Sequence, residues 1–328
     1  MRTERAVAGA RRAAVGPSAD LLVDLATRFY VAGQSQIEIA RALGLDASTV
    51  SRYLKRARDE GIVHVEIKRP RSLQGDLALE LASTFHLKKA VVVAGPPGPG
   101  SGDAVAKAAA DYVNSRLLNG MRLGLSWGRM LSAAIHKLPV GTVAELDISL
   151  LHGGMGRGGT GIQGHELARH LASLHPRSRV HYLHAPVLVD SPDIKEAMMR
   201  DRSIRAALES AASAEVALVG IGTLDDSAPL IRDHHISPRD RQRLLAQGAV
   251  GDMSTRFFNS EGEPVHVLDD RLIAVEWEQL KGVPLVIAMA SGLEKRAAIL
   301  GALRAACMDV LITDELTARS VLKAGRTG

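Results

Sequence analysis

Apolar positions follow two patterns along this chain. Up to about residue 60 they recur every three or four positions, the spacing of one face of a helix. From residue 89 onward, short β-branched runs alternate with stretches of helical spacing. Such alternation is typical of a parallel sheet covered by helices on both faces. The pattern therefore predicts a small helical domain followed by a doubly wound parallel-sheet domain of the α/β class, which suits a chain of 328 residues.

The helical region contains signals for two short helices joined by a tight turn. Ser35 and Glu38 have the spacing of a capping box, so we expect the first helix to begin at about Gln36. Gly44 follows the last apolar position, where a left-handed residue commonly ends a helix. The expected apolar face of this helix consists of Ile37, Ala40 and Leu43.

A second helix is expected to begin after Asp46, whose carboxylate can cap it. Val50, Leu54 and Ala57 form its apolar stripe, which would pack against the first helix. A preceding helix over 21–31 would brace the other two.

The outward face of the second helix carries hydroxyl groups near its start and cations farther along. This face suits a DNA major groove, because short side chains let the helix enter while Arg reaches guanine and Lys meets phosphate. It could instead be an ordinary solvated helix surface. The alternating run 62–68 after Gly61 predicts a wing-like strand. The candidate DNA-binding residues are Ser48, Thr49, Arg52, Lys55 and Arg56.

Net charge is concentrated at this end of the chain. The whole sequence carries +5, and residues 1–71 hold 13 Lys and Arg against 8 Asp and Glu, so the remainder is balanced. An aromatic content of 3% argues against stacking on single-stranded nucleic acid.

The single cysteine, Cys307, excludes an internal disulfide, and the adjacent His234 and His235 lack a third metal ligand at suitable spacing. We expect neither a metal nor another cofactor.

The expected location is the cytoplasm. No run approaches the roughly 18 apolar residues of a membrane span, and residues 1–19 lack the apolar segment of a signal peptide. The expected domains are a disordered basic tail at 1–19, a helix-turn-helix DNA-binding domain at 20–68, a linker and joining helix at 69–88, and the sheet domain at 89–328.

Seven strands and four helices are predicted after residue 88. The strands are expected within 89–94, 121–126, 145–153, 181–189, 216–222, 283–290 and 310–313. The helices are expected at 103–118, 127–138, 162–174 and 194–212, and the Pro- and Gly-rich segment 95–102 is expected to be a loop.

Four Gly-containing turns follow predicted strands, at 124–129, 152–159, 220–223 and 290–295. Ligands of doubly wound sheets bind beyond the carboxyl ends of the strands. A single such turn is weak evidence, because glycine often serves only the turn. Four turns at equivalent strand ends predict a ligand site, and the first of them runs into a helix whose free amides could hold an anion.

Four further segments resemble the SorC family of sugar-responsive bacterial transcription regulators, which is sometimes grouped with DeoR-type repressors. These segments are LGLSWGRML at 123–131, VALVGIG at 216–222, GAVGDMSTRFFNSEG at 248–262 and the run 290–318. The resemblance implies an effector domain similar to sugar-phosphate isomerases, a phosphorylated sugar as effector, and a dimer or tetramer that binds double-stranded operator DNA.

The resemblance also implies which residues bind the effector. Ser126, Trp127, Gly128 and Arg129 resemble the phosphate cradle, in which many relatives have a hydroxyl residue where Met130 stands here. Gly153 and Gly154 would form the opposite wall, and Asp252 with Lys295 resembles the pair that holds sugar hydroxyls.

Simpler roles for this pair stay open, since Asp252 could be a helix cap and Lys295 a solvated helix start. Two functions also stay open. One is an effector-controlled DNA-binding regulator, and the other is a sugar-phosphate isomerase-like enzyme with an appended DNA-binding module, since Lys and a carboxylate near a sugar phosphate can move a proton. Turnover of sugar phosphates would separate the two.

Overall fold

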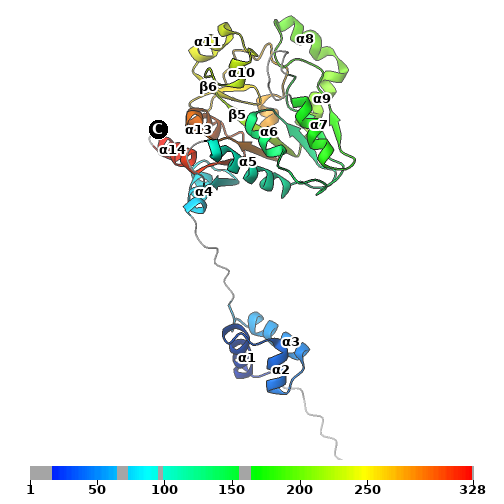
Figure 1. The fold of residues 1–328 in the computed structure, drawn as a ribbon, viewed down its shortest axis with the longest axis vertical. Coiled ribbons are helices and arrows are strands. Elements are labelled where there is room, and N and C mark those ends of the chain that lie inside the picture. The colour runs from blue at the N-terminus through cyan, green and yellow to red at the C-terminus, as the bar shows by residue number, and fades with distance from the viewer. Residues whose placement is uncertain (1–16, 65–72, 95–98, 155–163, 327–328) are drawn as a thin grey trace, which may run out of the picture. The chain divides into compact units, whose positions relative to one another are not determined.

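A computed structural model describes residues 17–64, 73–94, 99–154 and 164–326. The chain divides into two compact units, Met1–Pro70 and Arg71–Gly328 (Figure 1). Among the described residues, no helix is long and apolar enough to cross a membrane.

The first unit is a bundle of three helices. α1 (Ala19–Ala26) continues into a π-helical turn, η1 (Thr27–Val31), and is followed by α2 (Gln36–Leu43) and α3 (Ala47–Asp59). Their packed apolar side chains form two small buried clusters, made of Leu25, Ile39, Ala40, Val50 and Leu54 and of Leu22, Ala26 and Ala57. The helices predicted at 21–31, 36–43 and after Asp46 are all confirmed.

Side-chain caps fix where α2 and α3 begin. The backbone amide of Ser35 donates to the Glu38 carboxylate at 2.8 Å, and the amide of Glu38 donates to Ser35 Oγ at 3.3 Å, which completes the predicted capping box. Asp46 accepts from the amide of Thr49 at 2.7 Å. Gly44 ends α2 in the left-handed conformation, with φ 64°.

One expectation for this unit is wrong, and a second fails for those of its residues that are described. Ile37 is 64% exposed, and Ile39 is buried beside Ala40 in its place. These two isoleucines lie about 200° apart around a helix of 3.6 residues per turn, so only one can face the core. Ile62 and Val63 form no strand; they pack on the core, and the amide of Val63 donates to Ala57 O, while residues 65–68 of the expected wing lie outside the described residues.

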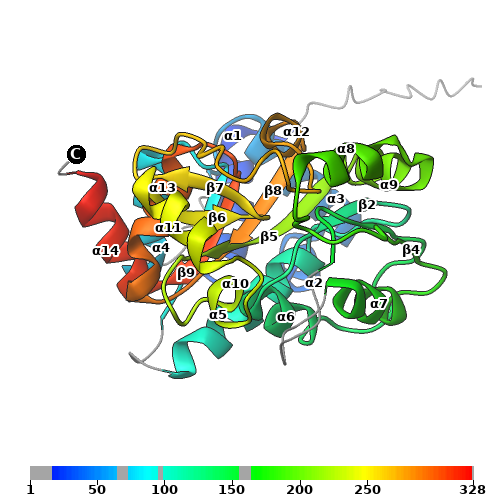
Figure 2. The same cartoon turned by 90° about the horizontal axis from the view of Figure 1, so that it is seen from above.

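The second unit is built on a parallel sheet with strand order β1-β9-β8-β5-β2-β3-β4. Figure 2 shows α5, α6 and α7 on one side of this sheet and α9 and α12 on the other. The predicted doubly wound α/β fold is therefore confirmed. The strands of this path are β1 (Lys89–Val93), β2 (Arg122–Leu125), β3 (Asp147–Leu150), β4 (Arg179–His181), β5 (Val216–Gly222), β8 (Leu285–Met289) and β9 (Val310–Asp314).

The helices of this unit cover the sheet and its ends. α4 packs against β1 and α14, with Leu77 and Leu81 in the main core, so it belongs to the second unit. The helices are α4 (Leu73–Thr84), α5 (Pro99–Asn114), α6 (Arg129–Ile135), α7 (Gly164–Leu174), α8 (Pro192–Arg200), α9 (Arg202–Ala212), α10 (Pro229–Arg232), α11 (Pro238–Ala246), α12 (Trp277–Lys281), the 3₁₀ turn η2 (Leu293–Lys295), α13 (Arg296–Arg304) and α14 (Glu315–Gly325).

Three predicted elements are wrong in part. The helix expected at 194–212 is two helices, because Asp201 is extended and its carboxylate accepts from the amides of Ser203 and Ile204 to start α9. The strand expected at 181–189 ends at His181, and only isolated bridges follow around Pro186, which has no amide hydrogen to donate. The loop expected at 95–102 gives way to α5 at Pro99.

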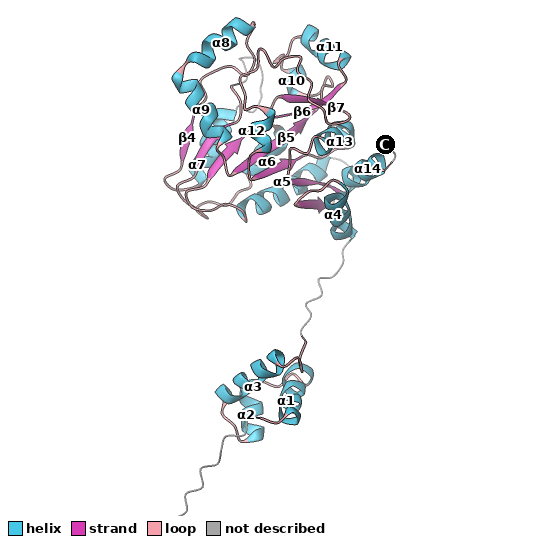
Figure 3. Ribbon diagram, turned by 180° about the vertical axis from the view of Figure 1, so that it is seen from behind, coloured by secondary structure: helices cyan, strands magenta, loops and turns pink. Residues whose placement is uncertain are grey.

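A hairpin that the sequence reading did not predict extends the end of β5. β6 (Ala249–Met253) pairs antiparallel with β5 and with β7 (Arg256–Asn259), near α10 and α11 (Figure 3). Ser254 and Thr255 connect β6 to β7 with φ 54° and 65°. Two consecutive residues with side chains in the left-handed region strain this turn, and such strain is often found beside functional sites.

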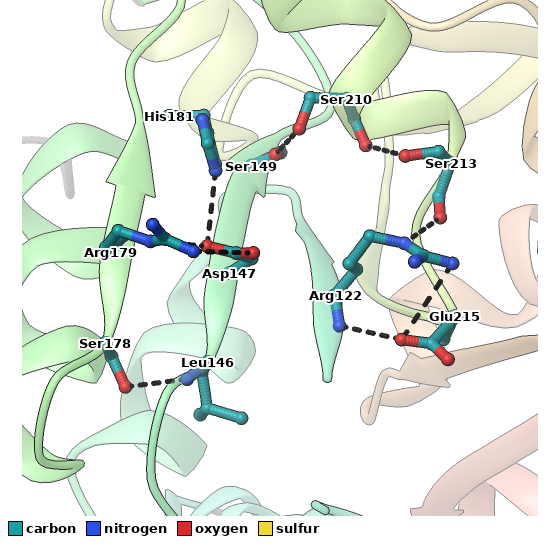
Figure 4. A network of polar contacts seen from close by, with 10 residues as sticks. All are labelled: Arg122, Leu146, Asp147, Ser149, Ser178, Arg179, His181, Ser210, Ser213 and Glu215. Atoms are coloured by element: carbon teal, nitrogen blue, oxygen red, sulfur yellow. Dashed lines mark hydrogen bonds and ion pairs between the residues drawn. The ribbon is translucent and has the colours of Figure 1, made fainter. Parts of the chain in front are cut away.

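Polar contacts join β3 to β4, and β2 to the residues just before β5 (Figure 4). Asp147 accepts from Arg179 at 3.1 Å and lies 3.4 Å from His181, while the amide of Arg122 donates to Glu215 at 3.0 Å. These groups are largely in solvent, so they contribute little to stability but align neighbouring strands.

The core of the second unit is apolar and contains the single thiol of the chain. Cys307 is 2% exposed, and burial raises the pKa of its thiol to about 12. A thiol in such surroundings stays protonated at neutral pH and is unreactive.

Candidate functional site

A cavity of about 600 Å³, which includes the part open to solvent, lies at the carboxyl ends of β2, β5 and β8. These strands are neighbours in the sheet, so the segments that follow them meet there. The lining residues are Ser126, Trp127, Gly128, Arg129, Met130, Gly220, Ile221, Gly222, Thr223, Ala228, Pro229, Leu230, Asp252, Ser254, Met289 and Lys295.

Asp252 is the most unusual group in this cavity. It is 4% exposed, and Oδ2 accepts from the amide of Thr255 at 3.1 Å. Oδ1 has no hydrogen-bond partner within the described parts of the chain. Burial raises the pKa of this carboxyl to about 6, against the lowering effects of the Thr255 amide and Lys295. An unpartnered buried oxygen costs free energy unless a ligand supplies a donor.

A glycine on the neighbouring strand makes room for this carboxylate. Gly222 pairs with Asp252 across β5 and β6, and a Cβ on Gly222 would lie 2.0 Å from Asp252 Oδ1. The close approach therefore requires glycine at 222, and the strained turn at Ser254 and Thr255 holds β6 against the strand end.

Two cations face the same cavity. Lys295 is partly buried and its Nζ donates to Ile221 O at 2.7 Å. Burial lowers the pKa of Lys295, and nearby Arg129 lowers it further, while Asp252 acts in the opposite direction. Arg129 is exposed and forms no hydrogen bond or ion pair with any other described residue. The pair gives one part of the cavity positive potential.

Ser126 lies at the end of β2 with its side chain buried. Its Oγ is 3.2 Å from Nε2 of His152, which comes from the end of β3, and Nδ1 of His152 is 2.9 Å from Gly153 O. Trp127 packs in a second apolar cluster with Leu224, Leu230 and Phe257.

The structure brings six of the eight predicted effector residues to one cavity. Gly153 and Gly154 are not among the described residues that line it. Their amides donate to Ile273 O and Ala185 O, and a Cβ on Gly153 would lie 2.6 Å from backbone atoms of Ala185 and Pro186. These glycines hold neighbouring segments together. Of the segment 155–159 nothing is described.

Sequence reasoning missed two residues near the site. His152 contacts Ser126, and Ser254 lines the cavity with a buried hydroxyl that lacks a partner in the described structure. His152 stood in a predicted Gly-rich turn, but nothing in its spacing indicated the contact with Ser126.

The outward face of α3 carries the predicted DNA-binding residues. Ser48, Arg52, Lys55 and Arg56 are exposed and Thr49 is half-buried. Ser48 and Thr49 donate their hydroxyl hydrogens to Asp46, at 2.5 and 2.9 Å, so the capping carboxylate orients both. These bonds and the amide of Thr49 lower the pKa of Asp46 to about 2.

The three cations on this face have different surroundings. Arg56 pairs with Glu60 at 2.5 Å, and Arg52 lies 5.7 Å from the centre of the Tyr53 ring. Lys55 forms no hydrogen bond or ion pair within the described residues. Lys55 is therefore the most available of the three, and Arg52 is held only by a 3.5 Å hydrogen bond to Thr49 Oγ1 and by its contact with the Tyr53 ring.

Comparisons with known proteins agree with this geometry. A family model described as "Putative sugar-binding domain" matches residues 71–323, and one described as "Winged helix-turn-helix DNA-binding" matches residues 32–64. The full-length sorbitol operon regulator SorC of Klebsiella pneumoniae has a solved structure with a TM-score of 0.70 and 29% identity, covering 92% of this chain and 98% of that one. The chain belongs to the SorC family.

Other SorC-family relatives are similar over nearly the same length. The transcriptional regulator LsrR of Klebsiella pneumoniae is 30% identical, covering 92% of this chain and 93% of the relative. The deoxyribonucleoside regulator of Bacillus subtilis is 29% identical, covering 92% and 97%. This SorC-family chain is thus a helix-turn-helix transcriptional regulator with an effector domain, and not an enzyme.

Proposed function

We propose that a phosphorylated sugar, or a related carbohydrate metabolite, binds in the cavity and controls operator binding by α3. The observation that carries this proposal is the buried, unpartnered Oδ1 of Asp252 in a cavity that also presents Lys295 and Arg129. A carboxylate oxygen accepts hydrogen bonds from hydroxyl groups, and the two cations suit a phosphate. The names of the relatives, which include a sorbitol operon regulator and a deoxyribonucleoside regulator, support a carbohydrate-containing effector.

Side-chain cations, rather than a helix end, are proposed to hold the phosphate. α6 follows the predicted cradle but has only seven residues. Its dipole is correspondingly small, and Met130 offers no hydroxyl. Arg129 has a free guanidinium among the described residues and can form two parallel hydrogen bonds with a phosphate.

A thermal-shift screen against pairs of free and phosphorylated sugars tests the effector class. A ligand that binds only the folded protein raises its melting temperature. We expect shifts from phosphorylated sugars and much smaller shifts from the corresponding free sugars. Equal shifts within every pair would contradict the phosphate site. Hits would then be added to an operator-binding assay, where a change in DNA affinity is expected.

A homo-oligomer, a dimer or a tetramer, is also proposed. One small helix-turn-helix unit makes few base contacts, so two units on a pseudo-palindromic site give better specificity. Because such a regulator acts on DNA, the proposal places it in the bacterial cytoplasm. Light scattering that shows only monomers, both with and without operator DNA, would refute the oligomer.

A further inference from the structure

The contacts of His152 determine which of its ring nitrogens carries a proton. Nδ1 lies 2.9 Å from Gly153 O, and a backbone carbonyl oxygen can only accept a hydrogen bond. Nδ1 must therefore be the protonated nitrogen.

His152 is also neutral in these surroundings. It is 3% exposed, and burial lowers the pKa of its imidazole to about 4, with a smaller lowering effect from His165 and an opposing effect from Gly153 O. A neutral ring with its proton on Nδ1 leaves a lone pair on Nε2. Nε2 therefore accepts a hydrogen bond, and the group 3.2 Å away is Ser126 Oγ.

The direction of these two hydrogen bonds determines whether the Ser126 hydroxyl can donate or accept in the cavity. Its single hydroxyl hydrogen points to His152, so only oxygen lone pairs remain for the cavity that Ser126 lines. We infer that His152 holds Ser126 as a hydrogen-bond acceptor, and that the effector places a hydroxyl or amino group, not its phosphate, against Ser126. This inference rests on the proposed effector site and specifies how the ligand is oriented in it.

A phosphate at Ser126 would be unfavourable. Phosphate oxygens are acceptors at neutral pH, and two acceptors without a hydrogen between them repel each other. Breaking the Ser126 bond to free its hydrogen would leave Nε2 of His152 buried without a partner, which costs free energy.

The rest of the cavity agrees with this orientation. Asp252 Oδ1 is a second acceptor that lacks a donor in the described structure, so the cavity offers two acceptors to ligand hydrogens. A polyol has hydroxyl groups on neighbouring carbons and can supply both hydrogens. Its phosphate then lies with Arg129 and Lys295. Ser126 thus belongs to the sugar-recognising part of the site, and not to the phosphate cradle that the family resemblance implied.

Nitrogen NMR on protein with ¹⁵N-labelled histidine measures the tautomer directly. The two-bond pattern of each ring shows which nitrogen is protonated, and a His152→Gln variant identifies the signals of His152 by their loss. We expect a neutral ring with the proton on Nδ1 and none on Nε2 at pH 7. A proton on Nε2, or a doubly protonated ring, would overturn the inference whether or not any sugar phosphate binds.

Binding of inorganic phosphate provides the second test. Ser126→Ala should change the phosphate affinity by less than about twofold, whereas Arg129→Gln should weaken it by about tenfold or more, as expected for loss of a charge-assisted hydrogen bond. A phosphorylated sugar found in the screen should bind more weakly to Ser126→Ala than to wild type. Equal weakening of inorganic phosphate by both substitutions would overturn the inference.

Each test contradicts a different claim if it fails. If inorganic phosphate does not bind the wild-type protein, the proposed anion site is wrong. The NMR measurement still decides whether Ser126 is an acceptor.

Discussion

The outward face of α3 holds most of its polar side chains in solvent, whereas the cavity of the second unit buries the side chains of Ser126, Asp252 and Ser254. Asp46 accepts the hydroxyl hydrogens of Ser48 and Thr49 within a single helical turn. In the cavity, by contrast, Lys295 reaches a carbonyl 74 positions away and Asp252 keeps one oxygen unpartnered among the described residues. A surface of satisfied groups can bind DNA with little reorganisation. A buried group without a hydrogen-bond partner can respond to a ligand, because the ligand supplies the missing hydrogen-bond donor.

Changing Asp252 to Asn should have the largest effect on stability. Its pKa is about 6 in the folded protein and about 4 when unfolded, so protonation favours the folded state. That stabilisation is complete below pH 4 and is lost as the pH rises through 6. Ionisation thus costs about 3 kcal/mol at pH 7, from about two pKa units. Asp252→Asn should be more stable than wild type by up to this amount.

Urea unfolding at pH 4 and pH 7 measures this difference. The gain should be present at pH 7 and small at pH 4, because other titrating groups are common to both proteins. Ser254→Ala serves as a matched control in the same cavity without a charge. A pH-independent difference between wild type and Asp252→Asn would refute the assigned cause.

Lys295→Ala should remove the influence of the effector on operator binding while leaving operator binding itself intact. Loss of a hydrogen bond to a charged group lowers effector affinity by about 1.5–3 kcal/mol, or roughly 10- to 150-fold. Operator binding without effector should stay at the wild-type level, because the substitution lies outside the DNA-binding unit. Fluorescence anisotropy of operator DNA with increasing effector measures both quantities. A normal effector response in this variant would place the site elsewhere.

Arg52→Ala should weaken operator binding by about 1–3 kcal/mol and relax the preference at one base pair, as expected for a base contact. Lys55→Ala is its matched partner on the same exposed face. This substitution should weaken binding to all DNA sequences equally. It should also reduce the slope of affinity against salt concentration by about the contribution of one phosphate contact. Titrations of operator and scrambled DNA at several salt concentrations separate the two roles. Wild-type behaviour of both variants would exclude this face of α3 from the groove.

Asp46→Ala should have the smallest effect, a modest loss of stability in the first unit. It removes the cap of α3 and releases the hydroxyls of Ser48 and Thr49. The pKa of Asp46 is lowered in the folded protein, so its contribution is present at neutral pH and is lost as the pH falls towards 2. Thermal melts should show that Asp46→Asn, which keeps a capping oxygen, is less affected. Equal loss in both variants would point to charge and not to capping.

The same contrast explains what the sequence could predict. The caps at Ser35 and Asp46 depend on residues three positions away, so their pattern is visible in the sequence. The strands of the parallel sheet follow from short β-branched runs, and α5, α6 and α7 follow from stretches of helical spacing, whereas α10 to α14 were not predicted. Local pattern does not decide which of Ile37 and Ile39 is buried, because the two lie on opposite sides of one helix and only one can face the core.

Long-range contacts account for what could not be predicted. The cavity needs Gly222 opposite Asp252, which depends on a hairpin without the Gly or Asn that usually marks such a turn. The contact of Ser126 with His152 joins the ends of two neighbouring strands, and no local pattern reports it. The family resemblance supplied Asp252 and Lys295 as candidates, whereas the burial and hydrogen bonding of each required the structure.

The buried thiol of Cys307 makes this protein convenient for site-specific labelling. It is the single cysteine of the chain, and its raised pKa keeps it unreactive towards maleimide reagents at neutral pH. A cysteine introduced at exposed Ser51 on α3 would therefore be the site that takes up a fluorophore, with no need to remove the native thiol. Emission from that dye would follow operator association, and any change in it on addition of a sugar phosphate, in real time.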